Sequence, residues 1–224
     1  MTVLYNDAEL TVALKPVGVS SQNEEGKASM TALLSDYYTK ENERATPYVL
    51  HRLDTGVGGV MVYAKNERAA AILSRDIAEG KLTKGYYAVV AGDASASLGK
   101  EGELFDLLFK DSKKNKSFVV ERKRRGVKEA ALRYRVLAKC EYEGNVLSLV
   151  EIELITGRTH QIRVQFSSRG LPLVGDGKYG SRVKGDIALF SKALAFRHPK
   201  TRQPMRFELP LPDRAIFDLF KELI

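Results

Sequence analysis

The most informative part of the sequence is HRLDTGVGGVMVYAK, residues 51–65. Three glycines stand within four residues, at positions 56, 58 and 59, and they permit backbone angles and close backbone contacts that other residues resist. The run from Gly58 to Ala64 is dense in Val, Met and Tyr, which favours a buried strand. The single carboxylate of Asp54 comes before this strand, in a place where an aspartate is more often a turn former than a catalyst.

The apolar spacing on both sides of this strand predicts a mixture of short strands and helices. Asn66 is a candidate N-cap for a helix over residues 67–79, and Gly80 suits the left-handed position after its end. The spacing also predicts helices at 28–39, 159–168 and 212–223, and strands at 3–5, 10–14, 84–91, 132–138, 146–154, 193–196 and 205–209.

The order of these elements indicates the fold class. Helices do not separate the strands regularly, and hairpin-like pairs recur, so we expect an α+β fold with a mixed, mostly antiparallel central sheet and flanking helices. No linker rich in Pro, Ser or Gly divides the chain, so we expect a single domain over residues 1–224.

The composition excludes several classes of protein. A hydrophobic share of 44% with 29% charged residues is typical of a globular protein and not of a disordered one. No run approaches the roughly 20 apolar residues that span a bilayer, and the first residues show no signal-peptide pattern, so we expect a cytoplasmic protein with no membrane partner. Cys140 has no partner for a disulfide, and the three histidines stand far apart in the sequence, so we expect no metal site.

The positive charge of the chain is concentrated in one segment. The whole chain has a formal net charge of +8, and residues 110–135 hold eleven Lys or Arg against three acids, which equals that excess. A charge run of this kind is either a solvated hairpin or loop, or an arm that contacts the phosphates of a nucleic acid.

A second polar block, LITGRTHQIRV, covers residues 154–164. It places Arg158 at the entrance of the helix expected at 159–168 and Arg163 on that helix. If this helix faces Asp54, one of the two guanidinium groups would keep the carboxylate ionised.

Together the two blocks resemble the RluA family of pseudouridine synthases, whose motifs read His-Arg-Leu-Asp and Gly-Arg-Thr-His-Gln-Ile-Arg. Further stretches are similar to other motifs of that family, in the same order along the chain. They are KPVG at 15–18, KGY at 84–86, PLVGD at 172–176 with YG at 179–180, HP at 198–199 and LPLP at 209–212. The resemblance therefore runs from about residue 3 to residue 212.

The resemblance implies that the protein isomerises uridine to pseudouridine in ribosomal or transfer RNA, without a cofactor or a metal. Asp54 corresponds to the nucleophile, which attacks either C1′ of the ribose or C6 of the uracil. Tyr86 corresponds to the tyrosine that stacks on the target base, Arg163 to the arginine that pairs with the carboxylate, and Arg52 to the arginine that assists extrusion of the nucleotide. His51 is expected to shape the loop and not to transfer a proton.

The chain departs from the family pattern in two places. The usual Thr-Ser-Gly step after the nucleophile is replaced by Val57-Gly58-Gly59, and Leu189 is followed by Phe190-Ser191 where His-Ala is common. Many relatives also carry a small RNA-binding domain before the catalytic one, whereas the pattern begins here at the third residue. We therefore expect the catalytic domain itself to bind RNA, through Arg158 and through Arg122, Lys123, Arg124 and Arg125. A monomer is the default expectation.

Two other classes of protein fit parts of the pattern. One is an RNA-binding relative that has lost turnover, although the joint presence of Asp54, Tyr86 and Arg163 argues against it. The other is a metal-dependent nuclease or phosphatase built on Asp54 and Asp176, which would need more clustered carboxylates or histidines than the sequence shows.

Overall fold

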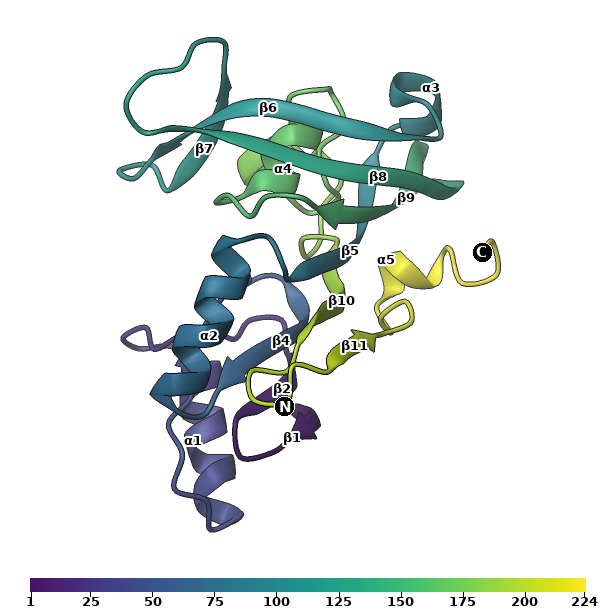
Figure 1. Ribbon diagram of the computed structural model, residues 1–224. Coiled ribbons are helices and arrows are strands. Elements are labelled where there is room, and N and C mark those ends of the chain that lie inside the picture. The colour runs from purple at the N-terminus through teal and green to yellow at the C-terminus, as the bar shows by residue number, and fades with distance from the viewer. The chain divides into compact units, whose positions relative to one another are not determined.

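The computed structural model describes residues 1–224 and contains two compact units (Figure 1). Unit 1 comprises Met1–Lys84 and Ser191–Leu209, and unit 2 comprises Gly85–Phe190 and Pro210–Ile224. The chain passes between the units three times: within strand β5 (Thr83–Ala91), within strand β10 (Leu189–Arg197) and after Leu209. A single catalytic domain that includes both units stays a prediction.

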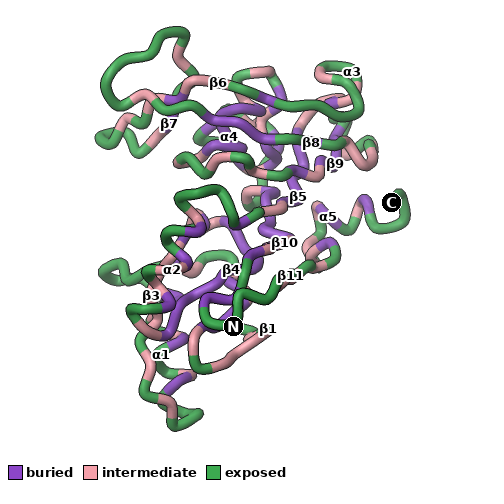
Figure 2. The backbone as a smooth tube through the Cα atoms, viewed as in Figure 1, coloured by how far each residue is buried: buried purple, intermediate pink, exposed green.

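Unit 1 is a sheet with two helices. Its strands β1 (Thr2–Asn6), β2 (Leu10–Lys15), β4 (Gly58–Ala64) and β10 follow one another in that order. The short strand β3 (Tyr48–Val49) pairs with β4, and β11 (Pro204–Glu208) pairs with β10. Every residue of β4 is buried, as Figure 2 shows, because this apolar strand lies inside the sheet with neighbours on both sides.

The two helices of unit 1 begin at side-chain caps. The Ser29 hydroxyl accepts a hydrogen bond from the Ala32 N–H at the start of α1 (Met30–Lys40), and the Asn66 side chain accepts one from Ala69 at the start of α2 (Glu67–Ala78). Gly80 has φ +71°, so the expected N-cap and the expected left-handed glycine are both confirmed. The apolar side of α2 packs on β2 and β4 through Ala69 and Leu73.

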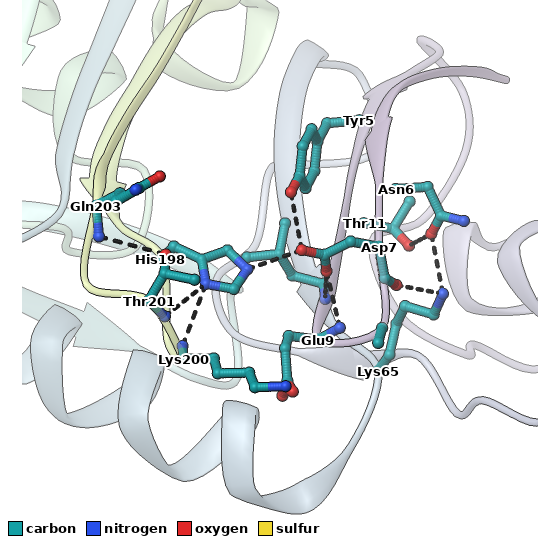
Figure 3. A network of polar contacts seen from close by, with 12 residues as sticks. Tyr5, Asn6, Asp7, Glu9, Thr11, Lys65, His198, Lys200, Thr201 and Gln203 are labelled. Carbon is teal, nitrogen blue, oxygen red and sulfur yellow. Dashed lines mark hydrogen bonds and ion pairs between the residues drawn. The ribbon is translucent and has the colours of Figure 1, made fainter.

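His198, the histidine of the His-Pro motif, connects two turns of unit 1 through hydrogen bonds. His198 Nδ1 accepts the backbone N–H groups of Lys200 and Thr201, so its Nε2 carries the proton and donates to Asp7 Oδ2 at 2.8 Å (Figure 3). Tyr5 also donates to Asp7 Oδ2, at 2.8 Å. These bonds tie the β1–β2 turn to the β10–β11 turn, which gives the His198-Pro199 motif a structural role.

Unit 2 is built on long antiparallel strands. In spatial order they are β5, β9 (Asn145–Leu154), β8 (Val127–Tyr142), β6 (Glu101–Asp111) and β7 (Lys116–Val120). Helix α4 (Gln161–Ser167) packs against this sheet, and α3 (Ala94–Leu98), the 3₁₀ turn η1 (Gly177–Tyr179) and α5 (Ala215–Asp218) complete the unit. All the strand pairs with a described register, in both units, are antiparallel, which confirms the expected α+β fold.

Several expected elements differ from the structure. The strand expected at 132–138 extends over Val127–Tyr142, and β6 and β7 were not expected at all. The prediction of a closing helix over residues 212–223 was wrong for all but the four residues Ala215–Asp218. No helix has both the length and the apolar character that a membrane crossing requires.

Candidate active site

Asp54 stands at the start of a tight turn in unit 1. The Val57 N–H donates to the Asp54 carbonyl at 2.9 Å, and the Gly18 N–H donates to the Thr55 carbonyl at 2.8 Å. The Asp54 side chain is half-buried, whereas the neighbouring Arg52 is exposed. The turn therefore holds the backbone of Asp54 in place without enclosing the carboxylate.

Two buried side chains fix the residues around this turn. The Ser21 hydroxyl accepts the Leu53 N–H at 2.9 Å and donates to the Leu53 carbonyl at 2.8 Å. His51 Nε2 accepts the Val62 N–H at 3.2 Å. Burial, together with the charge of Lys84, lowers the pKa of His51 to about 3, so the ring is neutral at neutral pH. This agrees with the expectation that His51 shapes the loop.

Lys15 supplies a buried cation beside the Asp54 turn. Its Nζ donates to the carbonyls of Val19 at 2.5 Å, Pro16 at 3.0 Å and Thr55 at 3.3 Å. Burial lowers the pKa of Lys15 to about 8, and the charge of Asp54 acts in the opposite direction. The Lys-Pro-Val-Gly motif was visible in the sequence, but the role of its lysine depends on burial and was not predicted.

In Val57-Gly58-Gly59, which stands in place of the Thr-Ser-Gly step, Gly59 packs closely against the backbone of Ser191. Gly59 has φ +127°, and a Cβ on this residue would lie 2.3 Å from the backbone oxygen of Ser191. The Ser191 hydroxyl in turn donates to the Val60 carbonyl at 3.1 Å. The hydroxyl that braces this loop comes from Ser21, a residue distant in the sequence.

Arg163 is held by a carboxylate of its own unit. Its Nε donates to Asp176 Oδ2 at 2.6 Å and its Nη2 to Asp176 Oδ1 at 2.8 Å, and both side chains are buried. The guanidinium carbon lies 5.0 Å from the centre of the Tyr179 ring. A bidentate pair of this kind fixes the plane of the guanidinium. The expected pairing of Arg163 with Asp54 stays a prediction.

Tyr179 braces the turn that leads into α4. Its hydroxyl accepts the Ser117 N–H at 2.8 Å and lies 2.9 Å from His160 Nδ1. His160 has a left-handed backbone, φ 54°, an uncommon conformation for a residue other than glycine. The motifs that contain Asp176 and Tyr179 therefore support Arg163, a role that the sequence resemblance alone did not assign.

The remaining expected site residues lie in both units. Asp54 and Arg52 belong to unit 1, and Tyr86, on β5, belongs to unit 2 with Arg163. Tyr86 is buried, 5% exposed. No group of three or more His, Cys, Asp or Glu side chains is placed to hold a metal ion, and the carboxylate of Asp176 is engaged by Arg163.

Comparisons with known proteins decide the family. Residues 9–168 match the family described as RNA pseudouridylate synthase. The chain belongs to this family. It is 33% identical over 221 residues to the uncharacterized RNA pseudouridine synthase YlyB of Bacillus subtilis, covering 95% of the chain and 70% of the relative. It is 29% identical over 241 residues to ribosomal large subunit pseudouridine synthase D of Zymomonas mobilis, covering the whole chain and 73% of that relative.

A solved structure supports the same fold. Human RNA pseudouridylate synthase domain containing 4 superposes with a TM-score of 0.79 at 21% identity, covering 97% of this chain and 91% of its own. The family match and the relatives confirm the resemblance to the RluA type. The protein is a pseudouridine synthase, an isomerase that acts on RNA.

Three of the residues that are expected to bind RNA in this pseudouridine synthase line one hollow in unit 2: Lys123, Arg124 and Arg158. Arg158 lies in the turn before α4, where its N–H is held by Gln161 Oε1 at 2.9 Å and its Nε donates to the Glu129 carbonyl at 2.8 Å. The hollow has a volume of about 540 Å³ and is lined by Leu107, Lys123, Arg124, Val127, Lys128, Glu129 and Arg158. Arg122 and Arg125 are exposed on the same loop but do not line it.

Proposed function

We propose that this pseudouridine synthase converts specific uridines of structured RNA through a covalent adduct with Asp54. The carboxylate attacks C1′ or C6, the bond between C1′ and N1 breaks, and the uracil rotates while it is held. A bond from C1′ to C5 then forms and the bond to the Asp54 carboxylate breaks. C5 loses its hydrogen as a proton and N1 gains a proton, so the product is an isomer of the substrate and the carboxylate is free again. A carboxylate suits this reaction because it is both a nucleophile and a leaving group.

The observation that carries this proposal is the immobilised turn at Asp54. A nucleophile held near its attack position reaches the reacting atom without a further loss of entropy. Hydrogen bonds from Val57 and Gly18 fix the turn, and the buried ammonium of Lys15 places positive charge beside the carboxylate. These contacts fix the position of the proposed nucleophile and place a cation beside it.

The other site residues have proposed roles around this centre. The Asp176 carboxylate and the Tyr179 ring orient the Arg163 guanidinium, which supports its proposed pairing with Asp54. Tyr86 would stack on the extruded uracil, and the exposed Arg52 would assist extrusion of the nucleotide.

Ribosomal and transfer RNA are the two substrate classes proposed for this enzyme. The name of the Zymomonas mobilis relative refers to the ribosomal large subunit, which makes ribosomal RNA the first class to test. Mapping pseudouridines in total RNA from cells with and without the gene identifies the modified position. A site that appears only in transfer RNA would overturn the ribosomal assignment.

The substitution Asp54→Asn tests the proposed nucleophile. Pseudouridine formation should fall by at least about 10⁴-fold, because the carboxylate forms the covalent adduct. RNA affinity and thermal stability should stay close to those of the unmodified enzyme. Asp36→Asn is the matched control, since it removes the same charge from an exposed position of unit 1 and should leave the rate unchanged. A normal rate for Asp54→Asn would exclude the proposed chemistry.

A further inference from the structure

The outward face of strands β6 and β7 carries exposed aromatic rings. Phe109 on β6 pairs directly with Phe118 on β7, and Phe105 points to the same side because it stands four residues before Phe109. Phe105 is 58% exposed and Phe118 is 36% exposed. The opposite side of these strands is the buried one, where Leu108 packs with Val164 of α4.

This arrangement reverses the usual pattern of a half-buried sheet. An antiparallel sheet with one face on a core normally presents polar side chains to water. Here β6 presents Phe105, Leu107 and Phe109 on its outward side. Exposed aromatic side chains grouped on one face of a sheet indicate a place where another molecule binds.

The charges around these rings indicate the chemistry of that molecule. Lys116 Nζ lies 5.7 Å from the centre of the Phe118 ring, and the guanidinium carbon of Arg124 lies 5.0 Å from the centre of the Phe109 ring. The basic hollow described above shares this face, with Leu107 and Val127 among its apolar lining residues. Aromatic rings interleaved with cations match a ligand that combines planar bases with phosphates.

We propose that this face binds unpaired nucleotides of the RNA substrate. Their bases stack on Phe105 and Phe118, and their phosphates contact the cations around the hollow. A volume of about 540 Å³ lies within the range of roughly 300–1,000 Å³ that is usual for small-ligand pockets, so the hollow can hold one nucleotide. The proposal rests on the proposed function, because the ligand is the RNA that the enzyme modifies. It adds that the enzyme prefers single-stranded segments beside its target.

The experiment compares a single-stranded oligoribonucleotide with a duplex of equal length. Fluorescence anisotropy measures the affinity of the full chain for a labelled oligouridine of about 12 nucleotides, a length within the site sizes of single-strand-binding folds. The double variant F105L/F118L keeps apolar side chains but removes both rings. Its single-strand affinity should fall about 10-fold or more, because stacking contributes on the order of 1–3 kcal/mol per base. Its duplex affinity should not change.

The slope of affinity against salt separates stacking from charge. The double variant should keep the slope of the unmodified enzyme, because no phosphate contact is removed. The matched control Leu223→Ala changes another exposed apolar residue of unit 2, 50% exposed, and should leave both affinities unchanged. Thermal melting of each variant verifies that the chain is folded.

Each other outcome overturns the proposal. Unchanged single-strand affinity, or an equal loss for single strand and duplex, would show that the rings do not stack on bases. A change in sedimentation of the double variant without a change in RNA affinity would make this face an interface between two copies of the chain. The Asp54→Asn enzyme should bind the oligouridine as tightly as the unmodified enzyme. If the stacking proposal fails, the proposed nucleophile is therefore still tested separately, by the rate of the Asp54→Asn enzyme.

Discussion

Lys15 and Arg163 are both buried cations, and the difference between their partners shows why each residue type is needed. The ammonium of Lys15 donates to three backbone carbonyls that surround it, a geometry that suits a compact group with three donors. The planar guanidinium of Arg163 meets the two oxygens of Asp176 side by side. An exchange of Lys for Arg would therefore not be conservative at either position.

The first prediction concerns the protonation of Lys15. Because the pKa of Lys15 is lowered to about 8, a rise in pH through this value removes the charge beside Asp54 and one of the three donors. The second-order rate constant kcat/KM should therefore be constant around neutral pH and decline as the pH rises through about 8. A pH profile with a fixed RNA substrate measures this decline. In Lys15→Met the rate should be lower throughout and this decline should be missing, and a variant that keeps it would assign the titration to another group.

The residues that the sequence did predict are those with a recognisable motif. Asp54, Tyr86 and Arg163 were expected from the order of the motifs, although the structure does not test their roles. The partnership of Arg163 with Asp176 and the contacts of Lys15 could not be predicted in the same way. They depend on which side chains become buried together after the chain folds, and linear spacing does not contain that information.

At the scale of secondary-structure elements, strong local signals gave accurate predictions. Strand β4 has the predicted bounds, and α2 begins after the predicted cap at Asn66 and ends before Gly80. Strand β6 was missed because the residues LFDLLF at 104–109 do not alternate regularly between apolar and polar. Strand β7 was missed because it lies within the highly charged residues 110–125. The last helix is short although Pro212 suits a first turn, since the chain after Phe220 is exposed and has no core to pack against.

The second prediction concerns the start of strand β4. A side chain at Gly59 would meet the backbone oxygen of Ser191 at 2.3 Å, and its φ of +127° is strained for any other residue. Since the obstacle is backbone within the sheet, Gly59→Ala should lower the free energy of unfolding by more than about 3 kcal/mol. Gly80→Ala is the control, because it has a similarly left-handed φ of +71° with no atom within 4 Å. It should cost only about 1–2 kcal/mol in urea unfolding, and equal losses for the two variants would disprove the steric argument.

At the scale of the whole molecule, the charge distribution is uneven. Residues 110–135 carry a net charge equal to the +8 of the entire chain, so the rest of the protein is close to neutral. The structure forms this segment into the end of β6, β7, the exposed loop 121–126 and the first half of β8. RNA attraction should therefore originate mainly from unit 2.

The last prediction tests where that attraction arises. Replacing Arg122, Lys123, Arg124 and Arg125 by Gln should flatten the slope of log affinity against log salt by up to about 3.6, because each of four phosphate contacts contributes roughly 0.9. The affinity of the unmodified enzyme for structured RNA, titrated at several salt concentrations, provides the reference.

A matched variant replaces four exposed cations of unit 1, namely Lys40, Arg44, Arg68 and Arg75. It removes the same net charge, so an equal change of slope in both variants would show that long-range charge and not contact governs binding. An unchanged slope in the loop variant would show that the loop does not contact phosphates, whereas a change confined to that variant places those contacts at residues 122–125.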